Sequence, residues 1–504
     1  MRDIYILFCA IFLACCTQTQ IDDEIAVEEQ ALTRSDTVNE YDLNALSALF
    51  EEDVRMLDEA MPQSCFIYSV STAPFNHSVV LSVNLDPHNT SDITKLLILV
   101  ESSIYNEVLD KIKRYAIDIS TAYGCAIFVE SVSGGSHIDI KNLILSYQKN
   151  LNGAVLIGDI PFAYFEIADD HKKYGYRKWP CDLYYMDLNG TWDDTDGNDI
   201  FDTHTGDILP EIFVGRISTK NMGTLVTEID GMNRYLDKNH DFWHGNTTIN
   251  YKSGLSYVDK DWASLSHHMH DIQYLYGNHN YETKCYGDSN FGRTEYLSCL
   301  INDNYEFIQL SCHASPTYLA MSGGSIWSNE IYNNGADAIG YNLFCCSACN
   351  WTGSANNGFL AGAHIYNAKQ KSLVVVGSTK TGSMLDFDYF YKPLGQGKPI
   401  GEALKAWWNI TQYRDAHSRI SWFYGMTIIG DPMINFLYKG IPHELTLNGY
   451  EATHSTLMSR GTLTVNNYVI PFGKHVTFKA PDVTLSSGFT CNKGGTFEIK
   501  NEFE

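Results

Sequence analysis

The stretch Tyr305–Trp351 reads YEFIQLSCHASPTYLAMSGGSIWSNEIYNNGADAIGYNLFCCSACNW. Its two apolar runs, Phe307–Leu310 and Ile339–Phe344, are too short for buried helices and are typical of buried strands. His313 follows the first run, and several cysteines follow the second. Open α/β sheets carry their functional residues in loops at the carboxyl ends of strands. The stretch therefore predicts two neighbouring strands with a histidine and a cysteine at the same edge of a sheet.

A histidine and a cysteine at that edge are the residue types that a thiol nucleophile needs. The imidazole can raise the thiolate fraction and later protonate the leaving group. A packed cysteine beside a hydrogen-bonded histidine would have the same sequence and no catalytic role. The order strand, histidine, helix, strand, cysteine, with small or polar residues after each strand, favours the catalytic interpretation.

Strand and helix patterns alternate on both sides of this stretch. Strands are expected at LLILVES, CAIFVESV, AVLIGDIPF, PEIFVGRIST, LVVVGST and MTIIGDP, and helices near residues 106–124, 138–150, 222–235, 262–276, 359–368 and 403–408. Such alternation predicts a parallel sheet with crossover helices. We expect an α/β fold in two consecutive subdomains, residues 91–240 and 241–440, the second of which carries the site.

The two ends of the chain follow other patterns. Short strands separated by Gly, Asn and Ser turns predict a small antiparallel β-module over residues 441–504, as a spacer or attachment domain. Residues 17–90 are acidic at first and then contain an amphipathic helix, followed by the β-rich pieces CFIYSV and SVVLSV. The apolar residues of that helix are Leu43, Leu46, Leu49, Phe50, Val54 and Leu57. This segment is expected to be a small N-terminal domain or a pro-segment that masks the site.

Residues 1–16, MRDIYILFCAIFLACC, have an apolar run too short to span a bilayer. Small residues and Cys15-Cys16 follow the run, which predicts a secretory signal with a possible lipoprotein box. We expect export, either to the bacterial cell envelope through an N-terminal lipid, as an outer-membrane lipoprotein, or as a secreted protein. No later segment is long and apolar enough for a transmembrane helix.

The formal net charge is −25, from 35 Lys+Arg against 60 Asp+Glu. Such a charge repels nucleic acid and anionic membrane surfaces, and no basic tract offsets it. It favours cationic ligands, metal ions or basic peptides. The partners expected are therefore proteins or peptides, and not nucleic acid.

With these elements placed, the chain from about Leu96 to Phe436 resembles the gingipain-type cysteine peptidases. The resemblance rests on VLIGDIPF, DLYYMDLNGTWDD, PEIFVGRI, the strand before His313, SACNWTG, VVVGSTKTGSM and IIGDPMINF, in that order. It implies the caspase-like fold shared with clostripain, legumain and caspases. It also implies a cysteine endopeptidase that needs no cofactor for its chemistry.

The resemblance implies roles for several residues of the predicted edge. His313 would assist a nucleophile about three dozen residues later; Cys349 fits that interval, and Cys346 is a rival because some relatives carry a Cys-Cys pair there. The length of the strand and the distance to the next helix favour Cys349. Backbone N–H groups of Ala314 and Cys349 would hold the oxyanion. The sequence departs from the family pattern because Cys312 and Ala314 stand where relatives have glycines beside the histidine.

Cleavage after Arg or Lys is a further implication of the resemblance. Asp261 falls in the loop where the family places the acid of its specificity pocket, and Asp259 is close by. Met384 would form a wall of the same pocket. A carboxylate at the base of a slot can pair with a long cationic side chain. The alternative for Asp261 is a solvated loop acid or a helix N-cap.

An acidic run offers possible ligands for calcium. Its oxygen-bearing residues surround Gly197 as in calcium loops; they are Asp193, Asp194, Asp196, Asn198 and Asp199. The run lacks the bidentate Glu of an EF-hand. A structural calcium ion is one expectation, and a solvated acidic turn is the other.

Two other functions stay open at this point. An inactive protein with a peptidase fold could hold basic peptides in an acidic cleft, as the altered histidine turn suggests. An envelope protein could instead bind glycans or surfaces through its aromatic residues, which include 32 Tyr and 9 Trp. In both cases the cysteine and histidine would be structural.

Overall fold

The computed structural model describes residues 42–60, 73–83, 94–244, 247, 254–277, 280–285, 292–302, 305–335, 338–352, 358–369, 371–436, 444–448, 456–459 and 462–500. The chain divides into two compact units, residues 1–46 and 47–504. All strands of the described residues belong to the second unit. The predicted signal and lipoprotein box, and the piece CFIYSV, lie outside the described residues.

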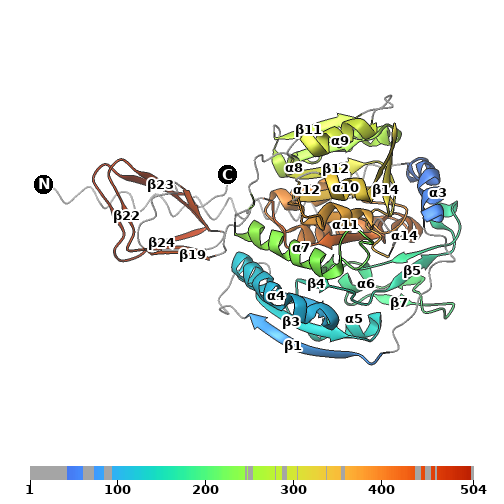
Figure 1. Ribbon diagram of the computed structural model, residues 1–504, viewed down its shortest axis with the longest axis horizontal. Coiled ribbons are helices and arrows are strands. Elements are labelled where there is room, and N and C mark those ends of the chain that lie inside the picture. Colours follow the sequence, from blue (N-terminus) through green and yellow to red (C-terminus); the bar gives the residue numbers. More distant parts are fainter. Residues whose placement is uncertain are drawn as a thin grey trace. The chain divides into compact units, whose positions relative to one another are not determined.

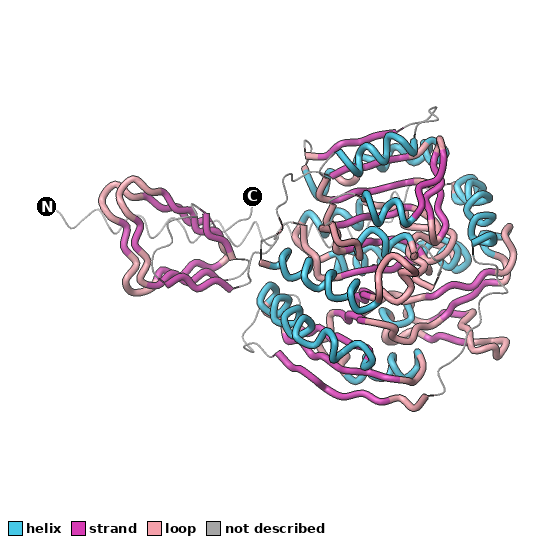
Figure 2. The backbone as a smooth tube through the Cα atoms, viewed as in Figure 1, coloured by secondary structure: helices cyan, strands magenta, loops and turns pink. Residues whose placement is uncertain are grey.

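A large sheet forms the centre of the α/β part of the chain (Figures 1 and 2). Its strand order is β1-β3-β2-β4-β9-β18-β17-β16-β12-β10-β11. The bounds are β1 Asn76–Val83, β2 Lys95–Glu101, β3 Ala126–Ser133, β4 Gly153–Ile157, β9 Phe213–Ile217, β10 Gly254–Val258, β11 Tyr281–Cys285, β12 Phe307–Ser311, β16 Gly340–Phe344, β17 Val374–Ser378 and β18 Met426–Gly430. Pairing is parallel from β3 through β2 and β4 to β9, and from β17 through β16, β12 and β10 to β11. The edge strand β1 pairs antiparallel with β3, and β18 pairs antiparallel with β17.

Three small sheets are separate from the large sheet in this part of the described chain. They are β5 Tyr164–Ile167 with β6 Arg177–Pro180, β7 Thr191–Asp193 with β8 Thr203–Thr205, and β13 His313–Ser315 with β14 Tyr318–Met321 and β15 Gly324–Trp327. All five residues of β4, β9, β12, β16, β17 and β18 are buried. Strands buried on both faces are expected where helices cover a parallel sheet. These apolar strands form the core that positions the site.

Helices cover the sheet as the alternating pattern predicts. Their bounds are α2 Leu43–Ser47, η1 Ala48–Phe50, α3 Glu51–Ala60, α4 Ser102–Tyr123, α5 His137–Ser146, η3 Asp170–Lys172, α6 Leu183–Met186, α7 Glu228–Trp243, η4 Lys260–His270, α8 Gln273–Tyr276, α9 Gly292–Asn302, α10 Ser328–Asn334, α11 Leu360–Ile365, α12 Asp388–Gly395, α13 Ile400–Trp408, η5 Asn409–Tyr413 and α14 Ala416–Phe423. No helix in the described part of the chain is long and apolar enough to cross a bilayer.

The α/β fold class is confirmed, but some predicted helix bounds differ from the structure. Helix α4 ends where expected, because Gly124 takes the left-handed conformation (φ 61°) that favours glycine at a helix end. The helix expected near 222–235 is α7, which starts six residues later, with Thr227 as its N-cap. The segment 262–276 is mainly the 3-10 helix η4 followed by the short α8. Sequence periodicity does not distinguish 3-10 from α-helix over such short segments.

The C-terminal module contradicts the prediction of antiparallel pairing. Its strands are β19 Glu444–Asn448, β20 Thr456–Met458, β21 Thr462–Asn466, β22 Val469–Ile470, β23 His475–Lys479, β24 Asp482–Leu485, β25 Thr490–Cys491 and β26 Thr496–Lys500. They pair in parallel as β19-β21-β24, β20-β23-β26 and β22-β25. Each strand thus pairs with one from the next coil of the chain, around a core that includes Leu463, Val465 and Phe478. Antiparallel pairing was wrong because alternation identifies a half-buried strand but not its partner.

Candidate active site

His313 and the cysteines lie at one edge of the sheet because β12 and β16 pair in parallel. Ser311 lies opposite Phe344 in their register. One residue further, the Cys312 N–H donates to the Phe344 carbonyl at 3.3 Å. His313 then opens β13, while the loop that holds the other cysteines begins after Phe344. The arrangement predicted from the stretch Tyr305–Trp351 is therefore present.

The two candidate thiols have different surroundings. Cys346 Sγ accepts from the Gly382 N–H at 3.4 Å and lies within hydrogen-bonding reach of the Asp53 carboxylate. Cys349 Sγ instead packs on β17, since a Cβ placed on Gly377 would lie 2.9 Å from it. The geometry thus favours Cys346 as the thiol that shares a site with His313.

The carboxylate of Asp53, from helix α3, is at the centre of this site. Its Oδ2 lies 2.6 Å from His313 Nδ1, and its Oδ1 accepts from the Ala314 N–H at 2.9 Å. The Cys346 thiol also acts on the pKa of Asp53, as a hydrogen-bond donor that lowers it. Asp53 was not among the site residues predicted from the sequence. Its position between Phe50 and Leu57 on the apolar face of a predicted amphipathic helix was the available signal, because acids rarely lie on such a face without a partner.

Side chains on either side of Asp53 fill further parts of the site. Phe50 is fully buried, and its ring centroid lies 4.9 Å from that of His171, 5.5 Å from that of Trp262 and 5.0 Å from that of Trp422. The Trp262 ring in turn lies 5.3 Å from the His313 ring. One α-helical turn beyond Asp53, Leu57 lines a small cavity with Asp170, Arg177, Lys178, Asn350, Thr379, Lys380 and Thr381. The buried face of the segment 47–60 therefore covers the histidine and Cys346.

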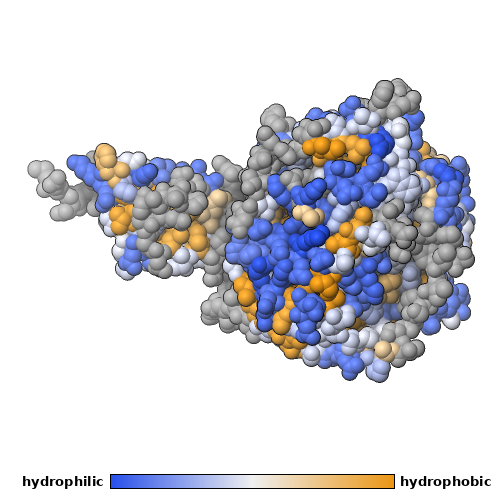
Figure 3. All heavy atoms as spheres, viewed as in Figure 1, coloured by the Kyte–Doolittle hydropathy of each residue, from blue (hydrophilic) through white to orange (hydrophobic). Residues whose placement is uncertain are grey.

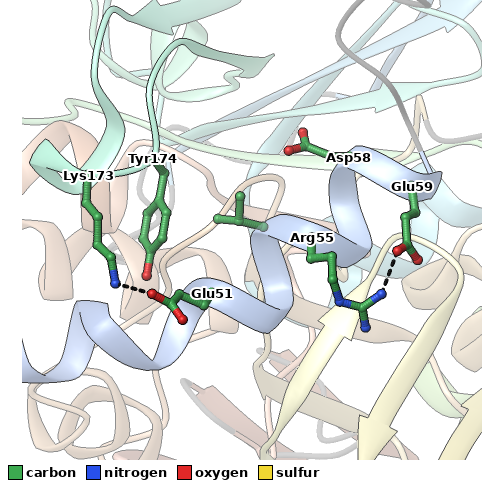
Figure 4. Close-up of a pocket in the computed structure, with 7 residues that line it drawn as sticks. Glu51, Arg55, Asp58, Glu59, Lys173 and Tyr174 are labelled. Atoms are coloured by element: carbon green, nitrogen blue, oxygen red, sulfur yellow. Dashed lines mark hydrogen bonds and ion pairs between the residues drawn. The ribbon is translucent and has the colours of Figure 1, made fainter.

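The outer face of α3 makes weaker contacts (Figure 4). Lys173 Nζ pairs with Glu51 Oε1 at 2.6 Å, and both side chains are largely exposed. Arg55 pairs with Glu59 of the same helix at 2.5 Å, and both side chains are more than half exposed. Exposed ion pairs stabilise little because water screens them and the side chains lose entropy. The segment 47–60 is thus held mainly by its buried side chains, which include Phe50, Asp53 and Met56.

Burial and neighbouring charges shift the pKa values of the site. Burial acts to lower the pKa of His313, but the charge and hydrogen bond of Asp53, together with Asp261 and Asp259, raise it above its ordinary value. Burial and the Asp53 charge raise the pKa of Cys346 well above the ordinary value. Burial also raises the pKa of Asp53, against the effect of His313. With Asp53 in place, the thiol is protonated and is not a nucleophile.

Other predicted site residues occupy several positions. Asp261 Oδ2 lies 3.5 Å from His313 Nε2, on the other side of the ring from Asp53, and its side chain is 47% exposed. Asp259 is buried and accepts from the N–H and Oγ–H of Ser322. Met384 is fully buried, with its sulfur 3.6 Å from Asn342 Nδ2.

The two backbone groups proposed for the oxyanion differ as well. The Ala314 N–H points at the Asp53 carboxylate, within the site. The Cys349 N–H donates to the Ser378 carbonyl at 3.0 Å and is not free to bind an oxyanion. Only the first is therefore placed to stabilise a charge beside Cys346.

The predicted calcium ligands make several different contacts in the structure. Asp194 accepts from the N–H groups of Gly197, Asn198 and Asp199, an arrangement that closes the turn without an ion. The oxygens of Asp196 come together instead with those of Glu166 and Asp202. Asp193 belongs to β7. Of the predicted acids, Asp196 belongs to a cluster of described carboxylates that could hold a metal ion, and calcium binding stays a prediction.

A family model and one solved structure agree with this architecture. The model of peptidase family C25 matches residues 106–437, about two-thirds of the chain. A solved structure described as a protease shares 12% identity, with a TM-score of 0.50 over 69% of this chain and 79% of that one. A crystal structure of the Arg-specific cysteine proteinase gingipain R shares 14% identity, with a TM-score of 0.48 over 72% and 84% of the two chains. No match was found among curated proteins.

The family match includes the sheet strands from β3 to β18, and it contains His313 together with both candidate thiols. It favours the peptidase over the two binding proteins considered from the sequence. The chain belongs to peptidase family C25 and is a cysteine-type peptidase.

Proposed function

We propose that this protein is a cysteine endopeptidase that is synthesised in a latent form, with Cys346 as nucleophile and His313 as general base. The observation that carries the proposal is the Asp53 carboxylate, which lies against His313 Nδ1, the Ala314 N–H and the Cys346 thiol. A carboxylate with these neighbours occupies the space that the scissile carbonyl of a substrate needs. The segment 47–60 would then act as a built-in inhibitor.

Catalysis would follow departure of this segment. Without Asp53, the His313 imidazole can accept the proton of Cys346, and the thiolate attacks the peptide carbonyl. The Ala314 N–H, released from the Asp53 oxygen, would donate to the oxyanion of the tetrahedral intermediate. His313 then protonates the leaving amine, which yields a thioester. Water, deprotonated by His313, hydrolyses the thioester and regenerates the thiol.

Cleavage after Arg or Lys is part of the proposal. The net charge of −25 favours cationic substrates, and Asp261 offers a half-exposed carboxylate near His313. Its distance of 3.5 Å from His313 Nε2 also suits a second role, orientation of the imidazole.

A peptide panel would test the activity and separate the two roles of Asp261. A recognition site for a specific protease is introduced within residues 61–72 and cut; this product is called the severed chain. We expect it to hydrolyse fluorogenic Arg and Lys peptides faster than the matching Phe peptide. If Asp261 binds the substrate cation, the variant Asp261→Asn should have a lower kcat/KM for basic peptides alone. If Asp261 instead orients the His313 imidazole, the same variant should have a lower kcat for every peptide. Absence of turnover on all peptides would reject the proposed function.

Latency is expected to weaken as pH rises. Asp53 raises the pKa of His313 in the docked state, so docking takes up protons. Because the pKa of His313 is higher in the docked than in the undocked state, its protonation stabilises docking fully at a pH below the ordinary histidine value of 6.5. This stabilisation is lost as the pH rises through the pKa of docked His313. Burial raises the pKa of Asp53 and acts in the same direction. The activity ratio of severed to intact chain should therefore fall as pH rises above about 6.5, the ordinary histidine value. A constant or rising ratio would contradict this expectation.

Export and ion binding complete the proposal. Export through the N-terminal leader, with lipid attachment as one route, agrees with a peptidase that is made latent. A structural calcium ion is proposed near the acidic turn, with Glu166, Asp196 and Asp202 as the oxygen ligands that lie close enough together.

A further inference from the structure

Helices α4 and α7 lie side by side (Figure 1) and bring together a carboxylate and two imidazoles away from the active site. Asp118 of α4 contacts two histidines of α7. Its Oδ2 lies 2.7 Å from His240 Nδ1, and its Oδ1 lies 2.9 Å from the Nε2 of His244. The three ligand atoms are all within 4.8 Å of one another. The mechanism proposed for the peptidase uses none of these residues.

The geometry of the helix explains why the imidazoles converge. His240 is followed four residues later by His244, so both project from one face of the helix. Their ring centroids are 4.2 Å apart, and each ring directs one nitrogen at the same carboxylate. The Asp118 side chain is 4% exposed, whereas the two histidine side chains are 25% and 53% exposed. The cluster therefore has a buried acid and an opening to solvent.

We propose that Asp118, His240 and His244 form a binding site for a transition-metal ion of the Zn²⁺ class. Two imidazole nitrogens and one carboxylate oxygen are a donor set that such ions prefer, whereas Ca²⁺ and Mg²⁺ prefer oxygen ligands. Three protein ligands leave a fourth position of a tetrahedral ion for water. The distances require only small side-chain adjustments, because a metal ion would separate nitrogens and oxygens that now share hydrogen bonds.

The surroundings suit a bound cation. Two basic side chains of α4, Lys111 and Arg114, are paired with Asp237 of α7 at 2.7 and 2.6 Å. The carboxylate of Asp237 therefore partly offsets the positive charges of Lys111 and Arg114, which would otherwise repel a cation. Hydrophilic side chains gather over α7 on the face drawn in Figure 3. The net charge of −25 also raises the local concentration of cations.

The position of the site indicates a structural role. The same two helices already share the buried carboxylate of Asp431, which accepts from Tyr115 of α4 at 2.8 Å and from Asn239 of α7 at 2.7 Å. A metal ion one residue along α7 from Asn239 would tie the helices together at their solvent side. We expect the bound ion to stabilise the fold and to leave the peptide-hydrolysis step unchanged.

Titration of the full chain with Zn²⁺ alone would test this inference. The thiols of the chain could bind Zn²⁺ as well, so the comparison is made between variants in a Cys346→Ala background. We expect His244→Ala and Asp118→Asn to lose one equivalent of bound Zn²⁺. Asp118→Asn retains a group that can hydrogen-bond to both histidines, which guards against loss of the fold. The matched control is His77→Ala, because His77 pairs with Glu130 at 3.2 Å as a single imidazole.

Two further readouts give the outcomes. Zn²⁺ should raise the melting temperature of the parent and of His77→Ala, on the order of 2–4 °C, and should not raise that of the two site variants. Co²⁺ should give a visible absorption band without the near-ultraviolet thiolate band of a cysteine site. Equal Zn²⁺ stoichiometry in all variants, or an equal thermal shift, would overturn the proposal and leave the cluster as a hydrogen-bonded His-Asp-His group.

Discussion

Cys346→Ala should lower kcat/KM of the severed chain by at least about 10⁴-fold, the scale on which removal of a nucleophile acts in other peptidases. Cys346 is the thiol that acts on the Asp53 carboxylate, to which His313 also forms a hydrogen bond, so it is the candidate thiol in the same site as His313. Cys349→Ala should retain most of the activity. Its sulfur packs on the backbone of β17 and its N–H bonds to Ser378, so its substitution affects packing more than chemistry.

The measurement is hydrolysis of fluorogenic basic peptides by both variants, with melting curves to establish that each is folded. Rates of alkylation give a second readout. In the severed chain one thiol should react fast with iodoacetamide, and that reaction should be absent from Cys346→Ala only. Loss of activity in Cys349→Ala alone would return the nucleophile to the residue that the sequence interval favours.

Asp53→Ala should raise the activity of the intact chain on the order of 10- to 100-fold. A hydrogen bond to a charged partner contributes about 1.5–3 kcal/mol, and about 1.4 kcal/mol is a factor of ten in an equilibrium constant. Asp53 makes such a bond to His313 and another to the Ala314 N–H. Their loss should therefore shift the balance from docked to undocked α3. Severing the chain within residues 61–72 should raise activity further, because the inhibitor is then no longer tethered.

Glu59→Ala is the matched control, since it removes an acid from the outer face of the same helix. Glu59 pairs with Arg55 of the same helix at 2.5 Å and its side chain is 61% exposed, so its removal should change activity little. Phe50→Ala should add to the effect of Asp53→Ala, because Phe50 fills the aromatic site between Trp262 and Trp422. Equal activity of Asp53→Ala and the parent, with the severed chain active, would show that latency resides in the apolar contacts. An intact parent as active as the severed chain would reject latency.

Much of the fold could be read from local patterns. Short apolar strands that alternate with amphipathic helices predict an α/β sheet. Each pattern is local, because the spacing of buried residues along a strand or a helix depends only on the geometry of that element. The same patterns place His313 and the cysteines after two strands. Parallel pairing of β12 and β16 then brings them to one edge. The edge of the sheet and the residue types of the site were therefore available from the sequence alone.

Tertiary structure decided which groups meet at that edge. Cys346 and Cys349 are three residues apart, and only the path of the loop after β16 places Cys346 beside the Gly382 N–H and the Asp53 carboxylate, and Cys349 against β17. Asp53 reaches His313 across 260 residues of sequence, a contact that no local pattern contains. Parallel coils in the C-terminal module are a third example. Burial periods specify which face of an element is covered; the covering partner depends on packing of the whole chain.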